Sequence, residues 1–152
     1  FTVLAILTVD KFGRKPLLAI GAVIMAIAMI GLGSGFSLGW AGGLNLTFML
    51  LYTAGFAMSW GPVCWVMLAE IFPNSVRSSV MSIAVAAQWV SNFLVSWTFP
   101  MMNKNEYLVN SFNHGFSYWV YGVMSVLAAV FILKMVPETK GKTLEDMNKL
   151  WK

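Results

Sequence analysis

Residues 59–77 read SWGPVCWVMLAEIFPNSVR and join an apolar run to a charged turn. Gly61 and Pro62 lie within the apolar part, and Pro62 has no N–H, so the carbonyl of Met58 loses its helical hydrogen-bond partner. A free carbonyl is costly in hydrocarbon, so membrane helices are interrupted mainly where they line protein or a wet cavity, as at transporter substrate sites. A simple proline kink in a packing helix is the alternative interpretation. Two neighbouring indoles and the charged turn favour the first.

The composition identifies a membrane protein. Of 152 residues, 59% are hydrophobic and 11% are charged, whereas soluble domains average about 25% charged residues. The net charge of +4 is divided among segments between long apolar runs, which does not suit nucleic acid as a partner. A single cysteine, Cys64, and a single histidine, His114, exclude an internal disulfide and a Cys/His metal site. No metal and no cofactor is therefore expected.

Four long apolar runs are each long enough to cross a bilayer as a helix, which predicts an all-α membrane fold. They cover residues 16–36, 46–69, 79–101 and 118–136. We expect loops at 37–45 and 103–115 and a charged turn at 70–78. Residues 1–9 are apolar but span only about half a bilayer as a helix, so we expect a partial helix there and a chain that is a fragment.

The C-terminal segment has a different pattern. Thr143 and Asp146 resemble a capping box, and Leu144, Met147, Leu150 and Trp151 form an apolar face. We therefore expect two parts: a transmembrane bundle at 1–136, and a tail at 137–152 that contains a short amphipathic helix.

The distribution of lysine and arginine predicts the orientation. If the segments around 10–15, 70–78 and 134–152 share one side, that side carries nine of the ten basic residues, and the other side carries only Lys104. The positive-inside rule then places these segments and the C-terminus in the cytoplasm.

Four motifs in order resemble the sugar porter family of the major facilitator superfamily. They are Asp10-x-x-Gly13-Arg14-Lys15, Gly61-Pro62-x-x-Trp65 with Glu70-x-x-Pro73-x-x-x-Arg77, Gln88-Trp89, and Pro137-Glu138-Thr139-Lys140-Gly141. The resemblance implies the C-terminal part of a twelve-helix transporter, from the end of helix 8 through helix 12, with an N-terminal half as its partner. It implies transport of a monosaccharide, with D-xylose favoured, across the bacterial inner membrane by alternating access, with protons as the coupling ion. A facilitative hexose or pentose uniporter is the alternative.

Candidate binding residues lie in two of the predicted spans. Gln88, Asn92 and Ser96 recur every four residues and share one helix face, either as a sugar-facing stripe or as hydrogen-bonding glue between helices. Amides that donate and accept, together with indole faces that stack, suit sugars. The resemblance implies that Gln88 bonds sugar hydroxyls, with the remaining candidates forming walls or lying nearby: Trp65, Trp89, Phe56 and Asn92.

Five charged residues match the cytoplasmic network that closes the inner mouth of the family's outward-facing state. They are Asp10, Arg14, Lys15, Glu70 and Arg77. Arginine pairs carboxylates through a fixed fork, so such pairs hold two bundles together in one state and separate in another. Ordinary solvated loop charge is the alternative.

Two other classes of protein fit the sequence less well. A membrane hydrolase needs a nucleophile with a positioned base, and His114 lies outside the predicted spans, so we predict no catalytic residue and no enzyme. A purely structural membrane protein does not need a helix break beside buried amides.

Overall fold

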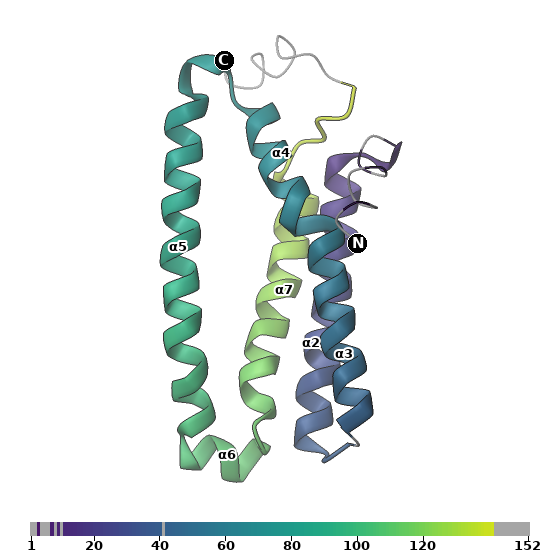
Figure 1. Ribbon diagram of the computed structural model, residues 1–152, viewed down its shortest axis with the longest axis vertical. Helices are drawn as coiled ribbons and strands as arrows, with labels where there is room; N and C mark the ends of the chain where they lie inside the picture. The colour runs from purple at the N-terminus through teal and green to yellow at the C-terminus, as the bar shows by residue number, and fades with distance from the viewer. Residues whose placement is uncertain (1–2, 4–6, 8, 10, 41, 142–152) are drawn as a thin grey trace.

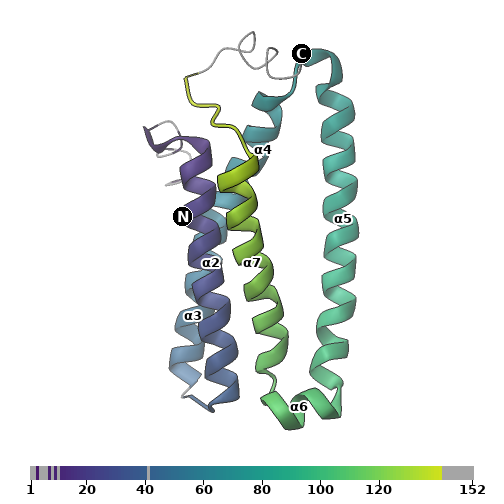
Figure 2. The same ribbon diagram turned by 180° about the vertical axis from the view of Figure 1, so that it is seen from behind.

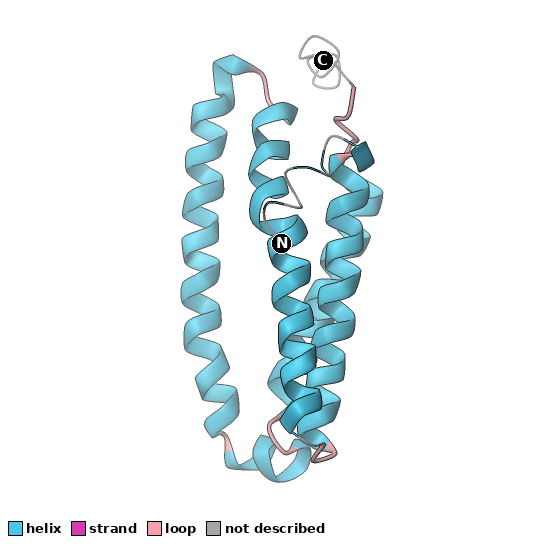
Figure 3. Ribbon diagram, turned by 45° about the vertical axis from the view of Figure 1, so that its right-hand side comes forward, coloured by secondary structure: helices cyan, strands magenta, loops and turns pink. Residues whose placement is uncertain are grey.

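A computed structural model describes residues 3, 7, 9, 11–40 and 42–141. The helices of this part are α2 (Arg14–Ser37), α3 (Gly42–Gly55), the π-helix η1 (Phe56–Trp60), α4 (Gly61–Ile71), α5 (Asn74–Lys104), α6 (Glu106–Phe112) and α7 (Gly115–Met135). Four segments are long and apolar enough to cross a membrane: α2, the continuous α3–η1–α4 unit, α5 and α7. Figure 3 shows helices and loops throughout the described residues. The prediction of an all-α membrane fold is confirmed.

Helix α2 is the centre of the packing. Figures 1 and 2 show α2, α3 and α7 side by side, with α5 standing beside α7 and joined to it through α6. A cluster of buried side chains joins α2 to α4 and α7; its members are Leu17, Leu18, Ala19, Val63, Met67, Ile71 and Ile132. None of the residues of α5 is buried. Most of the buried side chains therefore lie where α2 packs against α4 and α7.

Glycine allows α2 and α7 to approach closely. A Cβ atom added to Gly33 would lie 2.9 Å from the backbone oxygen of Gly115, and one added to Gly115 would lie 2.3 Å from the oxygen of Gly33. Real Cβ contacts of this kind do not occur, so only glycine permits this spacing. Close backbone approach at small residues is the usual way in which helices associate in lipid, where no hydrophobic force drives them together.

At the helix break expected around Gly61 and Pro62, the α-helical pattern gives way to the π-helix η1, and no loop separates η1 from α4. Gly61 N–H donates to the carbonyl of Phe56, five residues earlier, and the chain continues directly into α4. The fully buried hydroxyl of Ser59 donates to the Gly55 carbonyl at 2.7 Å. One wide π-turn thus accommodates the proline, and α4 leaves the axis of α3 at this point (Figure 1).

Three expected connections are shorter than predicted or contain structure. Helix α3 begins at Gly42, inside the expected 37–45 loop. Helix α6 lies within the expected 103–115 loop, capped by Asn105, whose side-chain oxygen accepts from the Tyr107 and Leu108 N–H groups. In the expected 70–78 turn, Glu70 belongs to α4 and Arg77 to α5. Uncharged runs mark the hydrocarbon, whereas helices continue into the polar interface where charged residues are tolerated.

Three sequence-based expectations fall wholly or mostly outside the described residues. They concern Asp10, the partial helix at 1–9, of which only residues 3, 7 and 9 are described, and the tail helix within 142–152. The division at residue 136 stays a prediction, although α7 ends at Met135 and the next residue has extended backbone.

Candidate functional site

A cavity of about 720 Å³ lies between α2, the α3–η1 segment, α5 and α7. Its aromatic walls are Tyr52, Phe56, Trp60, Phe99, Tyr118 and Tyr121, and methionines of α2, α3 and α7 line the space between them. Small-molecule sites typically measure about 300–1,000 Å³ and are mostly apolar with a few placed polar groups. The cavity therefore has the size and the lining of a ligand site.

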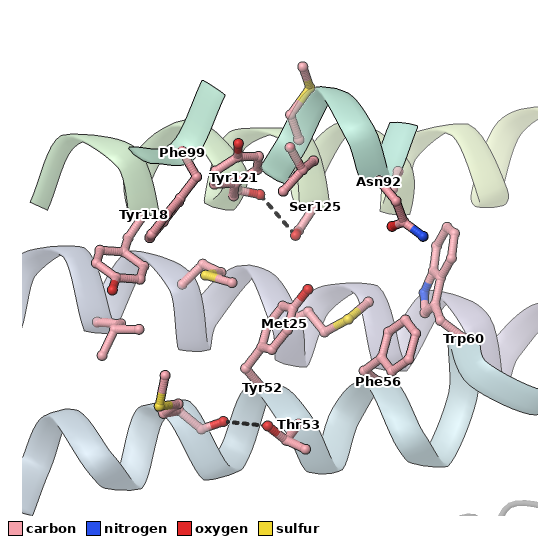
Figure 4. Close-up of a pocket in the computed structure, with 16 residues that line it drawn as sticks. Met25, Tyr52, Thr53, Phe56, Trp60, Asn92, Phe99, Tyr118, Tyr121 and Ser125 are labelled. Carbon is pink, nitrogen blue, oxygen red and sulfur yellow. Dashed lines mark hydrogen bonds between the residues drawn. The ribbon is translucent and has the colours of Figure 1, made fainter. Parts of the chain in front are cut away.

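Some polar groups of this cavity already have a hydrogen-bond partner within the protein, and others do not. The hydroxyls of Thr53 and Ser125 each donate to the carbonyl four residues earlier in their own helix, at 3.0 Å (Figure 4). The indole N–H of Trp60 donates to the carbonyl of Leu18 on α2 at 3.1 Å. The Tyr121 hydroxyl lies 3.2 Å from the hydroxyl of Thr98. These groups are already satisfied within the protein.

Three polar side chains of the cavity have no hydrogen-bond partner among the described residues: Asn92, Tyr52 and Tyr118. In Figure 4, Asn92 lies beside Trp60 and Phe56 at one end of the cavity, and Tyr118 lies beside Phe99 at the other. Tyr52 lies between these two ends. Open hydroxyl and amide groups are therefore spread along the whole length of the cavity.

An aromatic cluster closes the end of the cavity nearest α6. The ring of Tyr118 stacks on Phe36 of α2, with centroids 5.1 Å apart, and meets the ring of Phe99 edge-on at 5.5 Å. Phe99 also contacts Tyr121 at 6.0 Å. Such ring pairs each contribute about 0.5–1.5 kcal/mol beyond their buried area. They hold α5 against α2 and α7 at this end.

The structure brings only some of the predicted binding residues to the cavity. Phe56 and Asn92 line it, whereas Gln88, Trp89 and Trp65 do not contact this space. Asn92, Val95 and Phe99 are the residues of α5 that line it. At about 100° per residue, Gln88 lies within about 40° of each of these three around the axis of α5. It lies one helical turn before Asn92, on the side toward α4.

The two predicted indole walls lie away from the cavity. Trp89 is about 100° round α5 from Gln88, and its side chain is 69% exposed. Trp65 is half-buried on α4, beyond η1. The roles of both tryptophans in binding stay predictions.

Sequence reasoning missed most of the aromatic wall. Tyr52, Phe56 and Trp60 recur every four residues along one helix, directly before Gly61 and Pro62, and all three line the cavity. That spacing places them on one face. An aromatic residue in each of three successive turns before a helix break was the signal that pointed to this wall.

A charge network joins three segments at the opposite end of the bundle from α6. Arg14 Nη2 lies 2.8 Å from Glu70 Oε1, and the two side chains are 15% and 31% exposed. Glu70 Oε2 accepts a hydrogen bond from the Thr139 hydroxyl at 2.7 Å. The sequence predicts Arg14 and Glu70 in one network, and the structure brings their charges into contact.

Glu138 extends this network to the start of α2. Its carboxylate accepts the backbone N–H groups of Arg14 at 3.2 Å and Lys15 at 3.3 Å. Gly13, at the N-cap, provides no side-chain cap of its own. A carboxylate at a helix N-terminus accepts hydrogen bonds from N–H groups that have no partner within the helix, and its negative charge interacts favourably with the positive end of the helix dipole. The segment after α7 thereby holds the start of α2 in place.

Arg77 has a different contact. Its Nη2 donates to the carbonyl of Phe72 at 3.3 Å, across the turn between α4 and α5. This bond fixes the turn, because Phe72 follows directly on the last residue of α4. The described residues contain no group of three or more His, Cys, Asp or Glu side chains placed to hold a metal ion.

Comparison with known proteins identifies the family. The family described as "Sugar (and other) transporter" matches residues 1–151. The chain is 64% identical over 151 residues to the D-xylose-proton symporter of Escherichia coli K12, covering 99% of this chain and 31% of that protein. It is 47% identical over 152 residues to the glucose facilitated diffusion protein of Zymomonas mobilis, covering 100% and 32%.

Solved structures agree with this result. The chain matches the inward open conformation of the xylose transporter XylE from E. coli with a TM-score of 0.92 and 62% identity, covering 100% of this chain and 33% of that one. It matches the major facilitator superfamily proton:xylose symporter XylE bound to 6-bromo-6-deoxy-D-glucose with a TM-score of 0.89 and 63% identity, covering 99% and 32%. The chain thus spans about a third of the length of these relatives, and it belongs to the sugar transporter family.

Proposed function

We propose that this chain is part of a transporter that moves a monosaccharide, with D-xylose as the first candidate, across a bilayer by alternating access. The observation that carries the proposal is the aromatic cavity between four membrane spans, which begins beside the π-turn at Gly61. Flat C–H faces of sugars stack on aromatic rings, and their hydroxyls need groups that both donate and accept. Tyrosine and asparagine side chains with open hydrogen-bonding capacity meet both needs. Its relatives are named as transporters, and we assign no enzymatic role.

The proposed contacts to the sugar come from two spans. Gln88 and Asn92 of α5 offer amides on one face, and Phe56 offers a ring from η1. Trp65 and Trp89 complete the site when α4 and α5 meet the rest of the transporter, which supplies the opposite wall. Because α5 has no buried residue in the described structure, its face is available for such contacts.

The proposed role of the charge network is to hold the cytoplasmic mouth closed in one conformational state. Arg14, Lys15, Glu70 and Arg77 lie at or beside the ends of α2, α4 and α5, and Asp10 belongs to the same motif. Charge-assisted bonds between helix ends break and reform when helices move as rigid bodies. The pairs therefore bias the conformational equilibrium without touching the sugar.

We further propose that sugar transport is coupled to proton transport. The D-xylose-proton symporter supports it, whereas the glucose facilitated diffusion protein supports a uniporter as the alternative. Glu70 is the only acidic residue in the described membrane spans, and it lies at the cytoplasmic end of α4 by our orientation. We infer that a proton-carrying group, if present, lies in the part of the transporter outside this chain.

Uptake of D-xylose by cells that produce the full-length transporter tests the proposal. We expect saturable uptake of labelled D-xylose, together with alkalinisation of a weakly buffered medium as protons enter. Uptake without a pH change, insensitive to a protonophore, would establish the uniporter. No uptake and no binding of pentoses or hexoses would reject the transporter.

We propose that the chain lies in the bacterial inner membrane with its C-terminus in the cytoplasm, as the distribution of basic residues requires. An impermeant thiol reagent added to intact cells tests this orientation, using single-cysteine variants in which Cys64 is replaced by serine. We expect Lys104→Cys to be labelled and Lys142→Cys to be protected until the cells are opened. The reverse pattern would overturn the orientation.

A further inference from the structure

The three aromatic residues that precede Gly61 differ in what they offer a ligand. Tyr52, Phe56 and Trp60 are spaced four residues apart, so each lies about 6 Å along the helix from the next. Phe56 has no polar atom, and the indole N–H of Trp60 is engaged by the carbonyl of Leu18. Tyr52 alone among the three carries an open hydrogen-bonding group, because its hydroxyl has no partner among the described residues.

The surroundings of Tyr52 do not satisfy its hydroxyl. In Figure 4 the ring projects from α3 into the cavity and the hydroxyl points toward the side lined by α7. The nearest elements contribute thioethers, among them Met25 and Met49, which are weak acceptors. The hydroxyl of Ser125 on α7 is engaged by its own helix. A hydroxyl held in such apolar surroundings gains most from a polar ligand, because it otherwise stays unpaired.

The position of Tyr52 relative to Phe56 sets which part of a sugar it reaches. The proposed binding residues Phe56 and Asn92 lie at the end of the cavity nearest Trp60 (Figure 4). Tyr52 lies one helical turn from Phe56 toward the α6 end. A sugar stacked at Phe56 therefore presents the hydroxyls of its far side to Tyr52.

We propose that Tyr52 is a specificity-determining residue, whose phenolic hydroxyl pairs with one hydroxyl of the sugar on the side facing α6. This inference rests on the proposed function, since it assumes that a monosaccharide occupies the cavity. Tyr52 then selects for sugars that carry a hydroxyl at that ring position. A site built to pair a substrate hydroxyl discriminates against analogues that lack it, because its own polar group is left unpaired.

Tyr52→Phe tests this inference, because it removes only the oxygen and keeps the ring. In the full-length transporter we expect D-xylose affinity, measured by calorimetric titration, to fall by about 3- to 10-fold, the effect of one lost hydrogen bond. Titrating the monodeoxy derivatives of D-xylose identifies the partner. The derivative that lacks the paired hydroxyl should bind to the wild type and to Tyr52→Phe with the same affinity. Each of the other derivatives should bind more weakly to Tyr52→Phe than to the wild type.

Tyr107→Phe is the matched control, since Tyr107 lies on α6 outside the cavity and is 76% exposed. It should bind every sugar as the wild type does. If the wild type binds sugars and Tyr52→Phe binds them all equally well, this inference is wrong while the proposed function stands. An equal loss for every derivative would also reject it, because that pattern indicates a packing effect. Absence of sugar binding by the wild type would reject the proposed function itself.

Discussion

Gln88→Ala is expected to weaken D-xylose binding by roughly 5- to 150-fold in the full-length transporter. The amide both donates and accepts, and its loss leaves sugar hydroxyls unpaired in a desolvated site, which costs about 1–3 kcal/mol. Gln88 falls in the middle of the sector of α5 that lines the cavity through Asn92, Val95 and Phe99. Calorimetric titration measures the change, and thermal melting confirms that the variant is folded.

Three further substitutions separate the binding site from general damage. Trp89→Ala should also weaken binding by removing a stacking surface, whereas Trp65→Ala should slow transport more than it weakens binding, because Trp65 lies on α4 beyond the π-turn. Ser34→Ala, at the α6 end of α2 and outside the cavity lining, should change little. If Gln88→Ala binds D-xylose and D-glucose as the wild type does, Gln88 acts as a hydrogen-bonding link between helices.

The sequence predicts the membrane spans well because their signal is local. A run of about 20 apolar residues specifies a helix in lipid whatever its neighbours are, since every backbone group must find a partner within the helix. The π-turn at Phe56–Trp60 has no comparable signal. Pro62 shows that one hydrogen bond is lost, but whether the helix stops or widens depends on packing, here on Ser59 against Gly21 of α2.

Helix α6 was not predicted, although its sequence contains local helix signals. Residues 103–115 are polar enough to be predicted as a loop, yet seven of them form a helix whose first N–H groups are satisfied by Asn105. Asparagine is a strong N-cap residue, and Glu106 in the first turn favours the helix dipole. These local signals are present in the sequence, but an interpretation based only on the polarity of the segment does not use them.

For the candidate site, the sequence predicts which residues share a helix face, but not which other helices that face contacts. Four-residue spacing predicts that Gln88 and Asn92 share one face of α5, but it does not reveal which turn of that face meets α2, α3 and α7. In the charge network, Arg14 and Glu70 follow from the motif, whereas the capping of α2 by Glu138 joins residues 124 positions apart. Such a pairing arises from the fold, and no spacing within one segment predicts it.

Glu70→Ala is expected to slow sugar transport by about tenfold while leaving sugar affinity largely unchanged. Glu70 holds both the Arg14 guanidinium at 2.8 Å and the Thr139 hydroxyl at 2.7 Å, and both contacts are partly shielded from water. Charge-assisted bonds of this kind contribute more than exposed pairs, and a loss of about 1.4 kcal/mol in one state shifts a conformational ratio tenfold. Initial uptake rates measure transport, and equilibrium titration measures affinity.

A double-mutant cycle shows whether the effect runs through the Arg14–Glu70 pair. Arg14→Ala and Glu70→Ala should each slow uptake, and the double variant should be little slower than either, because either single substitution already removes the contact between the two side chains. Glu106→Ala on α6, at the opposite end of the bundle, is the control and should transport as the wild type does. Fully additive effects of Arg14→Ala and Glu70→Ala would show that the pair does not act as a unit. A fall in sugar affinity with an unchanged conformational distribution would mean that Glu70 acts on the binding site itself, and the proposed closing of the cytoplasmic mouth by this pair would be wrong.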